Sequence, residues 1–299
     1  MPTTPFSGSI VATVTPMDSG AQLDRGALEK LLRRQLAAGT GGVVIAGTTG
    51  EGAVLSEAMF EACMAVARDV VSDSNVALIA GLGSPSTDKC KTQLRAAERC
   101  GASALLCVTP YYLKTTQAGL EAHFRALADL ASVPVILYNV PGRTANDLLP
   151  ETTIRLSGHP NIVAIKEAVP DMGRIQMLVG ETSGDFAVLS GDDESACQAM
   201  LRGASGVISV TANVAPEPMA RLARLAMTGE VEQASKLDEQ LAPLHRAMMM
   251  EPNPIPVKAA LAQLGLLEEH LALPLVPATS ATKMTLSELV ADLPATWTE

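Results

Sequence analysis

Short apolar runs alternate with helical patterns along most of the 299-residue chain. The runs are apolar almost throughout, which is typical of parallel strands covered on both faces by helices. Eight strand-helix units in about 230 residues predict an α/β fold, a (β/α)8 TIM barrel over residues 1–228. A doubly wound sheet is the alternative, but no G-x-G-x-x-G turn follows the first strand. We expect strands at Ser9–Thr15, Gly42–Gly47, Val76–Gly81, Ala104–Thr109, Val133–Asn139, Ile162–Lys166, Phe186–Ser190 and Gly206–Val210.

The intervening segments have helical periodicity. Gly39 is the expected end of the first helix, and Ser56 is the expected N-cap of the second. Residues 229–299 predict further helices, and no flexible linker precedes them. We therefore expect a C-terminal helical extension packed on the barrel. The predicted helices are Asp24–Ala38, Ser56–Val71, Thr87–Cys100, Thr116–Ala131, Pro150–Ser157, Asp171–Gly180, Glu194–Arg202, Pro216–Thr228, Val231–Met250, Ile255–Leu264 and a short one from Leu286–Val290.

Charge and composition exclude several classes of partner. The net charge of −10 argues against nucleic acid and against an anionic membrane surface. No stretch approaches the roughly 20 apolar residues of a membrane span. The first residues lack the charged and apolar regions of a signal peptide, so a cytoplasmic location is the default expectation.

Cysteine and histidine usage predicts neither a metal site nor a disulfide framework. The five cysteines form no C-x-x-C pair, and we expect small core side chains in a reducing compartment. The four histidines have no ligand spacing and no nearby acidic cluster. The sequence thus predicts no metal and no cofactor.

Lys166 is the residue with the strongest chemical implication. It closes the apolar strand Ile162–Lys166, and burying an unpaired ammonium is costly. Loss of the proton would make the amine a nucleophile that can form a Schiff base with a carbonyl compound. The alternative is a lysine whose head reaches solvent at the strand end.

Other strand ends carry side chains that suit a carbonyl-condensing site, because active-site groups gather at the carboxyl ends of barrel strands. Thr48 and Thr49 offer hydroxyls and backbone N–H groups to a small carboxylate, although a simple glycine-threonine turn is the alternative. Tyr138 can pass protons once another hydroxyl orders it, or can be a core residue. Arg143 can grip a carboxylate with two hydrogen bonds, or can form a surface ion pair.

Three acidic residues have competing interpretations. Asp192 and Asp193 resemble a metal pair, but capping of the next helix is the favoured role. Glu167 follows Lys166 directly. It can act as a general base or as a structural hydrogen-bond partner.

A family resemblance emerges from the set GTTGE (47–51), TPYY (109–112), YNVPGRT (138–144), IKEA (165–168), SGDD (190–193) and GVISVTAN (206–213). This set resembles the 4-hydroxy-tetrahydrodipicolinate synthase family, formerly called dihydrodipicolinate synthase. The family belongs to the class I aldolase superfamily that also holds N-acetylneuraminate lyase. The arginine of YNVPGRT is the narrower mark of the synthase.

The resemblance implies a Schiff base between Lys166 and pyruvate, whose enamine attacks L-aspartate 4-semialdehyde to give 4-hydroxy-tetrahydrodipicolinate. This is the committed step of the diaminopimelate route to lysine. Tyr138 and Thr48 would form a proton relay with a third member, Tyr112. Thr48 and Thr49 would hold the pyruvate carboxylate, and Arg143 would bind that of the semialdehyde.

Further implications concern the pocket wall, assembly and regulation. Gly191 and the carbonyl of Ile208 would line the pocket beside the lysine. Tyr112 would reach into the site of a neighbouring subunit, in a homotetramer built from two tight dimers. Lysine-inhibited members carry an Asn and an acidic or His residue where this chain has Pro85 and Lys89, so we expect weak or absent inhibition by L-lysine.

Two rival functions remain. A sibling aldolase would act on a sugar-derived 2-keto acid, but a polyol substrate gives Arg143 no carboxylate to bind. A non-catalytic homologue should have lost members of the relay, whereas all of them are present.

Overall fold

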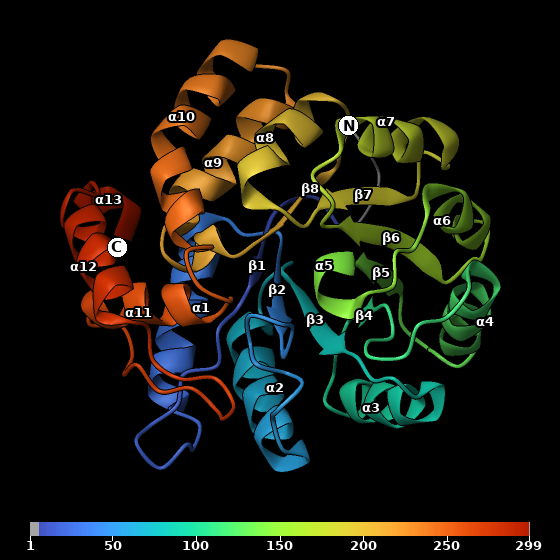
Figure 1. Ribbon diagram of the computed structural model, residues 1–299, viewed down its shortest axis with the longest axis horizontal. Helices are drawn as coiled ribbons and strands as arrows, with labels where there is room; N and C mark the ends of the chain where they lie inside the picture. Colours follow the sequence, from blue (N-terminus) through green and yellow to red (C-terminus); the bar gives the residue numbers. More distant parts are fainter. Residues whose placement is uncertain (1–5, 299) are drawn as a thin grey trace.

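The computed structural model describes residues 6–298, and its centre is a closed barrel of eight parallel strands that follow one another in chain order. The predicted (β/α)8 fold is therefore confirmed (Figure 1). Some strands end earlier than expected, because the chain turns away to form loops. Ala46, for example, has a positive φ of 57° directly after β2. The strands are β1 (Gly8–Ala12), β2 (Gly42–Ile45), β3 (Ala77–Leu82), β4 (Ala104–Val108), β5 (Val135–Asn139), β6 (Ile162–Glu167), β7 (Ala187–Ser190) and β8 (Gly206–Ser209).

Helices surround the barrel, and their ends carry the expected caps. The Ser56 side chain accepts a hydrogen bond from the Met59 N–H, and Gly39 has a φ of 81° at the end of the first helix. A short helix, α5, was missed because it contains only four residues. The helices around the barrel are α1 (Arg25–Ala38), α2 (Glu57–Val71), α3 (Thr87–Arg99), α4 (Gln117–Ala128), α5 (Pro141–Thr144), α6 (Pro150–Ser157), α7 (Met172–Glu181), α8 (Asp193–Leu201), the 3-10 turn η1 (Thr211–Asn213) and α9 (Pro216–Met227).

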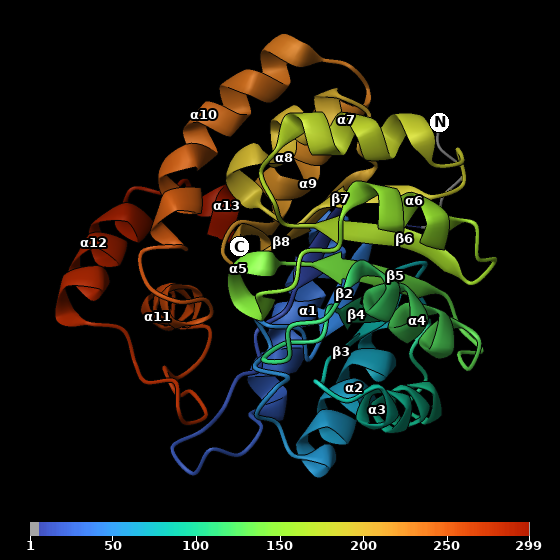
Figure 2. The same cartoon turned by 45° about the vertical axis from the view of Figure 1, so that its right-hand side comes forward.

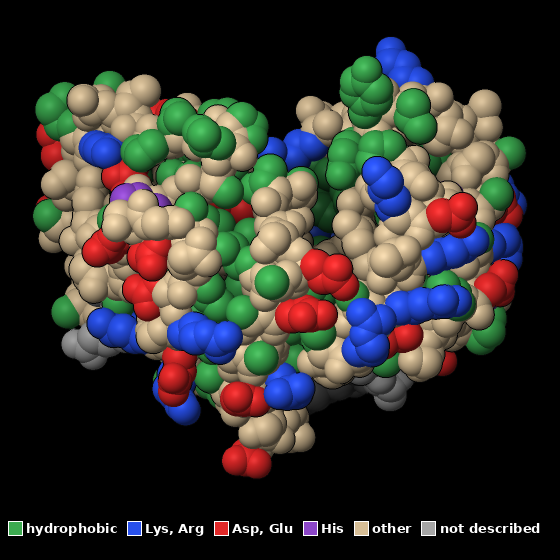
Figure 3. Space-filling model, turned by 90° about the horizontal axis from the view of Figure 1, so that it is seen from below, with side chains coloured by type: hydrophobic (Ala, Val, Ile, Leu, Met, Phe, Trp, Pro, Cys, Tyr) green, Lys and Arg blue, Asp and Glu red, His purple; other side chains and the backbone are tan. Residues whose placement is uncertain are grey.

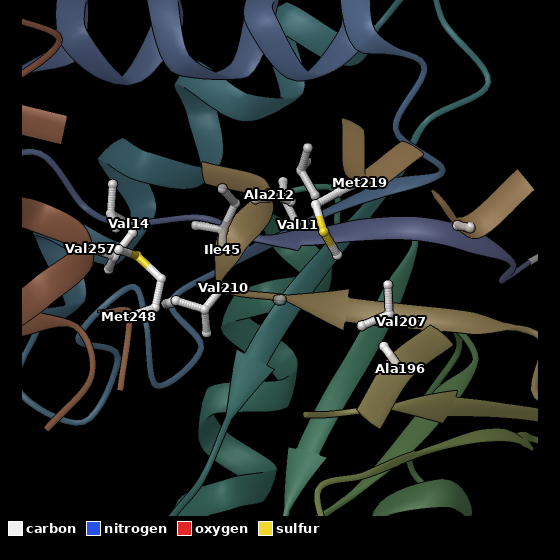
Figure 4. Close-up of a cluster of buried hydrophobic side chains, with 14 of the residues drawn as sticks. Val11, Val14, Ile45, Ala196, Val207, Val210, Ala212, Met219, Met248 and Val257 are labelled. Carbon is white, nitrogen blue, oxygen red and sulfur yellow. The ribbon is translucent and has the colours of Figure 1, made fainter. Parts of the chain in front are cut away.

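The strands separate two apolar clusters. Side chains on the outer face of the strands, such as Val11 and Val207, pack against helix side chains such as Met219 of α9 (Figure 4). Side chains on their inner face fill the barrel, and several of these are small, such as Ala12, Ala104 and Ala187. Burial on both faces explains why the strands read as continuous apolar runs.

The C-terminal helices lie together on one side of the barrel (Figures 1 and 2). Met248 and Val257 join the outer apolar cluster with Val14, so this segment packs on the barrel. The last long helix begins at Ser280, where the Thr279 side chain caps it. The sequence predicted a later start, because the first turn of this helix has little apolar periodicity. The boundary between 1–228 and 229–299 stays a prediction. The helices are α10 (Val231–Ala247), α11 (Ile255–Gln263), α12 (Ser280–Ala291) and α13 (Ala295–Thr298).

The surface carries mixed charge. Figure 3 shows Lys and Arg side chains interspersed with Asp and Glu over one face, without a broad basic patch. Among residues 6–298, no helix is long and apolar enough to cross a membrane.

Candidate active site

Lys166 and Tyr138 face each other across neighbouring strands. They are paired in the β5–β6 register, and the inner apolar cluster includes Tyr138. The Lys166 Nζ lies 4.6 Å from the centre of the Tyr138 ring. Lys166 is 5% exposed, and the described residues offer its amine no ion pair. Lys166 is therefore buried beside a phenol, which favours a buried amine over the alternative of a lysine whose head reaches solvent.

Gly191 gives the lysine side chain its space. A Cβ added at this position would lie 2.9 Å from the Lys166 Cε and 2.9 Å from the Ala168 Cβ. Such contacts are shorter than real Cβ atoms make, so a side chain here would displace the lysine. Ile208 belongs to the inner apolar cluster on β8. The structure thus places Gly191 directly beside Lys166.

A cavity of about 340 Å³ opens at the carboxyl ends of β2 to β5. Its walls include three predicted site residues, Thr48, Tyr138 and Arg143. Lys166 does not line this cavity. Its amine contacts the ring of Tyr138, and Tyr138 does line it. No hydrogen bond joins the hydroxyls of Thr48 and Tyr138 within residues 6–298, so their relay stays a prediction.

The loop after β2 has a tightly constrained backbone. Ala46 and Glu51 both have positive φ, and a Cβ on Gly52 would collide with the Ala46 carbonyl at 1.8 Å. Thr49 is buried in this loop, where its hydroxyl accepts a hydrogen bond of 3.0 Å from the Asn253 side chain. The loop therefore depends on glycine and on the C-terminal segment for its shape.

Asn253 links two of the predicted carboxylate-binding residues. Its side chain bonds Thr49, and its carbonyl oxygen accepts a hydrogen bond of 3.2 Å from the Arg143 guanidinium. Arg143 itself is exposed on the short helix α5 at the cavity wall. Sequence reasoning assigned no role to Asn253, because its segment lies more than a hundred residues beyond either partner.

A buried ion pair links the loop after β2 to helix α11. The Lys258 Nζ on α11 lies 2.7 Å from Glu51, and both side chains are fully buried. The amine also donates to the Thr15 carbonyl, and the other Glu51 oxygen accepts from the Ala272 N–H. Burial lowers the pKa of Lys258, while Glu51 opposes that shift. Lys258 was missed, although it stands in an apolar run as Lys166 does.

Tyr112 lies apart from the other predicted catalytic residues in the single chain. Its side chain is 89% exposed, and its φ of 71° is one that non-glycine residues rarely adopt. Tyr111, its neighbour, lines the cavity and donates to the Gly83 carbonyl. The structure therefore brings Tyr111 to the cavity and directs Tyr112 away from it.

The acidic candidates have structural roles. The Asp192 side chain caps α8 through the Ser195 N–H, as predicted. Asp193 was expected to cap the same helix, but it is the first residue of α8, and its side chain instead accepts hydrogen bonds from the Val210 and Thr211 N–H groups at the end of β8. The Glu167 carboxylate is buried and bonded to Arg174, and this arrangement favours the structural interpretation over a general base.

No group of three potential metal ligands occurs among residues 6–298. The five cysteines are free, and four of them are buried. Burial raises the pKa of Cys63 and of Cys90 to about 11, so these thiols remain protonated core groups near neutral pH.

A (β/α)8 barrel with a buried lysine and a tyrosine paired at the carboxyl ends of adjacent strands is the arrangement of a class I aldolase. Within this class, the dihydrodipicolinate synthetase family model matches residues 5–293. The chain belongs to this family.

Named relatives agree over nearly the whole chain. The chain is 49% identical to the 4-hydroxy-tetrahydrodipicolinate synthase of Stutzerimonas stutzeri, over 90% of this chain and 92% of the relative. It is 44% identical to the enzyme of the same name from Stenotrophomonas maltophilia, over 97% of both. The dihydrodipicolinate synthase of Acinetobacter baumannii, solved with pyruvate, superposes with a TM-score of 0.93 at 43% identity, over 96% of this chain and 98% of that one.

Proposed function

We propose that this protein condenses pyruvate with L-aspartate 4-semialdehyde to 4-hydroxy-tetrahydrodipicolinate, in lysine biosynthesis, through a Schiff base on Lys166. The observation that carries the proposal is the buried amine without an ion pair, beside Tyr138 and opposite Gly191. Relatives that share this activity by name support the choice of substrates.

The chemistry begins at the lysine. The neutral amine attacks the pyruvate carbonyl, and loss of water leaves an imine. The imine is an electron sink, so a proton leaves the adjacent methyl group and an enamine forms. The enamine carbon then attacks the semialdehyde carbonyl. Transimination by the substrate amine closes the ring and frees Lys166.

Two groups of residues would bind the two carboxylates. Thr48 and Thr49 would hold that of pyruvate, and the contact from Asn253 to Thr49 supports a fixed position for the loop. Arg143 would bind that of the semialdehyde at the cavity wall. Its hydrogen bond to the Asn253 carbonyl leaves further guanidinium donors for a ligand. Tyr138 would pass protons to and from the imine.

Tyr112 would complete the proton relay in the neighbouring subunit. Its exposure and its strained backbone support this role, because strain of this kind persists where it serves a function. We propose a homotetramer of two tight dimers. Tyr112→Phe should lower kcat without changing stability. Unchanged kcat would show that this relay is wrong.

Regulation and location complete the proposal. We propose a cytoplasmic enzyme with weak or absent inhibition by L-lysine, since Pro85 offers no side-chain hydrogen bond and Lys89 would repel an ammonium group. Lys89 is exposed near the start of α3. Inhibition by micromolar lysine in the activity assay would contradict this part.

The main test combines a coupled assay of both substrates with borohydride reduction in pyruvate and mass spectrometry. Turnover with a reduced pyruvate adduct on Lys166 is the expected result. An adduct without turnover would retain the Schiff-base chemistry and point to another aldehyde, beginning with sugar-derived ones. Absence of an adduct would refute the proposal.

A further inference from the structure

A network of four polar side chains lies directly behind the proposed catalytic pair. Asn139 follows Tyr138 on β5, Glu167 follows Lys166 on β6, and the two are paired in the same register. Because successive side chains on a strand point to opposite faces, Asn139 and Glu167 point outward where Tyr138 and Lys166 point inward. Any shift of the outer pair along the strands therefore moves the inner pair as well.

Asn139 joins the two strands through its side chain. Its Nδ2 lies 3.0 and 3.1 Å from the two Glu167 oxygens and 2.9 Å from the Asp147 Oδ1. Its Oδ1 accepts a hydrogen bond of 2.8 Å from the Leu148 N–H. The amide is therefore satisfied at both ends, and its orientation is determined by these contacts.

Arg174 on α7 closes the network. Its Nε donates to Glu167 at 2.8 Å, and its two terminal nitrogens donate to the two Asp147 oxygens at 3.0 and 2.7 Å. One terminal nitrogen also donates to the Leu148 carbonyl. The Arg174 side chain is 10% exposed and that of Glu167 is fully buried. A planar fork of five donors suits this geometry, which a lysine cannot reproduce.

Electrostatics make the network depend on the arginine. Burial raises the pKa of the Glu167 carboxyl, and the Arg174 charge opposes that shift. Burial lowers the pKa of Arg174, but its bonds to Asp147 and Glu167 outweigh this and raise it. Without the guanidinium, two carboxylates would face each other across the Asn139 amide.

Within the proposed function, we infer that Arg174 is a positioning residue for the Schiff-base reaction. It holds the ends of β5 and β6 so that the Lys166 amine and the Tyr138 hydroxyl keep one spacing while the substrate carbon changes from carbonyl to imine to enamine. Arg174 touches no substrate. Its effect passes through Glu167 and Asn139 to the neighbouring inward side chains.

The test compares Arg174→Met, Arg174→Lys and wild type. The measurements are kcat, KM for pyruvate, the rate of the borohydride-trapped adduct and the exchange of pyruvate methyl protons in D2O. We expect kcat and methyl exchange to fall about 100-fold in Arg174→Met, the loss typical of an ångström-scale misplacement, with a smaller change in KM. Arg174→Lys should retain part of the rate, since it keeps the charge without the fork.

If Arg174 had a purely structural role, its replacement would lower stability without lowering kcat or methyl exchange per folded molecule. Arg34→Met is the matched control, because Arg34 is also buried but bonds the Asn213 and Val214 carbonyls on the other side of the barrel. It should lower Tm while kcat and exchange per folded molecule stay near wild type. Equal kcat and exchange in folded Arg174→Met and wild type would overturn the inference.

A second variant covers the case in which Arg174→Met does not fold. Glu167→Gln keeps the size of the side chain but replaces one acceptor oxygen with an NH2 group, which would face the donors of Asn139 or Arg174. This variant should lower methyl exchange at least tenfold. Wild-type exchange in this variant would overturn the inference. Wild-type protein that forms no pyruvate adduct would instead refute the proposed function, and the inference with it.

Discussion

The described part of the chain buries two lysines, and their surroundings differ. Lys258 is neutralised by Glu51 at 2.7 Å and donates to the Thr15 carbonyl. Lys166 has no ion pair among the described residues and instead contacts the Tyr138 ring, with Gly191 leaving space around its stem. Both lie in apolar runs of the sequence. An apolar run thus predicts a buried lysine, and the surrounding groups determine whether it is reactive or structural.

The largest expected effect is on activity at Lys166. Lys166→Met keeps an apolar side chain of similar length but removes the amine, so no imine can form. We expect activity to fall by about 10³-fold or more and the borohydride adduct to disappear. Thermal stability should remain near that of wild type, because no ion pair is lost. Retention of turnover would exclude Lys166 as the nucleophile.

At Lys258 the effect should be on stability. Lys258→Met leaves the Glu51 carboxylate buried and unpaired, which typically costs about 3–5 kcal/mol. Denaturant unfolding measures this loss. The double variant Glu51→Gln/Lys258→Met removes both charges and should recover part of it. A loss below about 1 kcal/mol in the single variant, typical of exposed pairs, would contradict the contrast between the two lysines.

His123 is a buried histidine whose protonation should change the stability of the fold with pH. Burial lowers its pKa to about 4, and its Nδ1 contacts the Thr87 hydroxyl at 2.9 Å. Below pH ~6.5 the unfolded chain binds a proton that the folded chain does not, so stability falls between pH ~6.5 and ~4, by up to about 3 kcal/mol. His123→Asn should flatten this part of the stability profile. An unchanged profile would assign the loss to other groups.

Gly191→Ala tests the space around Lys166 with the smallest change. The added methyl group would press on the Lys166 Cε and the Ala168 Cβ, and we expect kcat to fall about tenfold. Gly180→Ala on α7 is the matched control, because a Cβ there meets nothing within 4 Å. If the two variants had equal kcat, packing at Gly191 would have no bearing on the lysine.

The barrel could be predicted because each strand is buried on both faces and reads as a separate apolar run. Strand ends were less predictable. The chain leaves β2 at Ala46, for example, because this residue has a positive φ, and no sequence pattern predicts that conformation for an alanine. Within the site, motif residues next to strands were found from the sequence. Asn253 and Arg174 were missed because their partners come from distant segments or neighbouring elements.

The pair between Glu51 and Lys258 spans 207 residues of sequence. All eight strands are synthesised by residue 209, before the lysine that neutralises Glu51 exists in the nascent chain. In a nascent chain that ends before residue 258, the Glu51 carboxylate therefore has no Lys258 amine to neutralise it. Contacts between residues so far apart in sequence form slowly. Because Lys258 lies on α11, the loop after β2 can reach the arrangement described above only once residue 258 has been synthesised and has packed on the barrel.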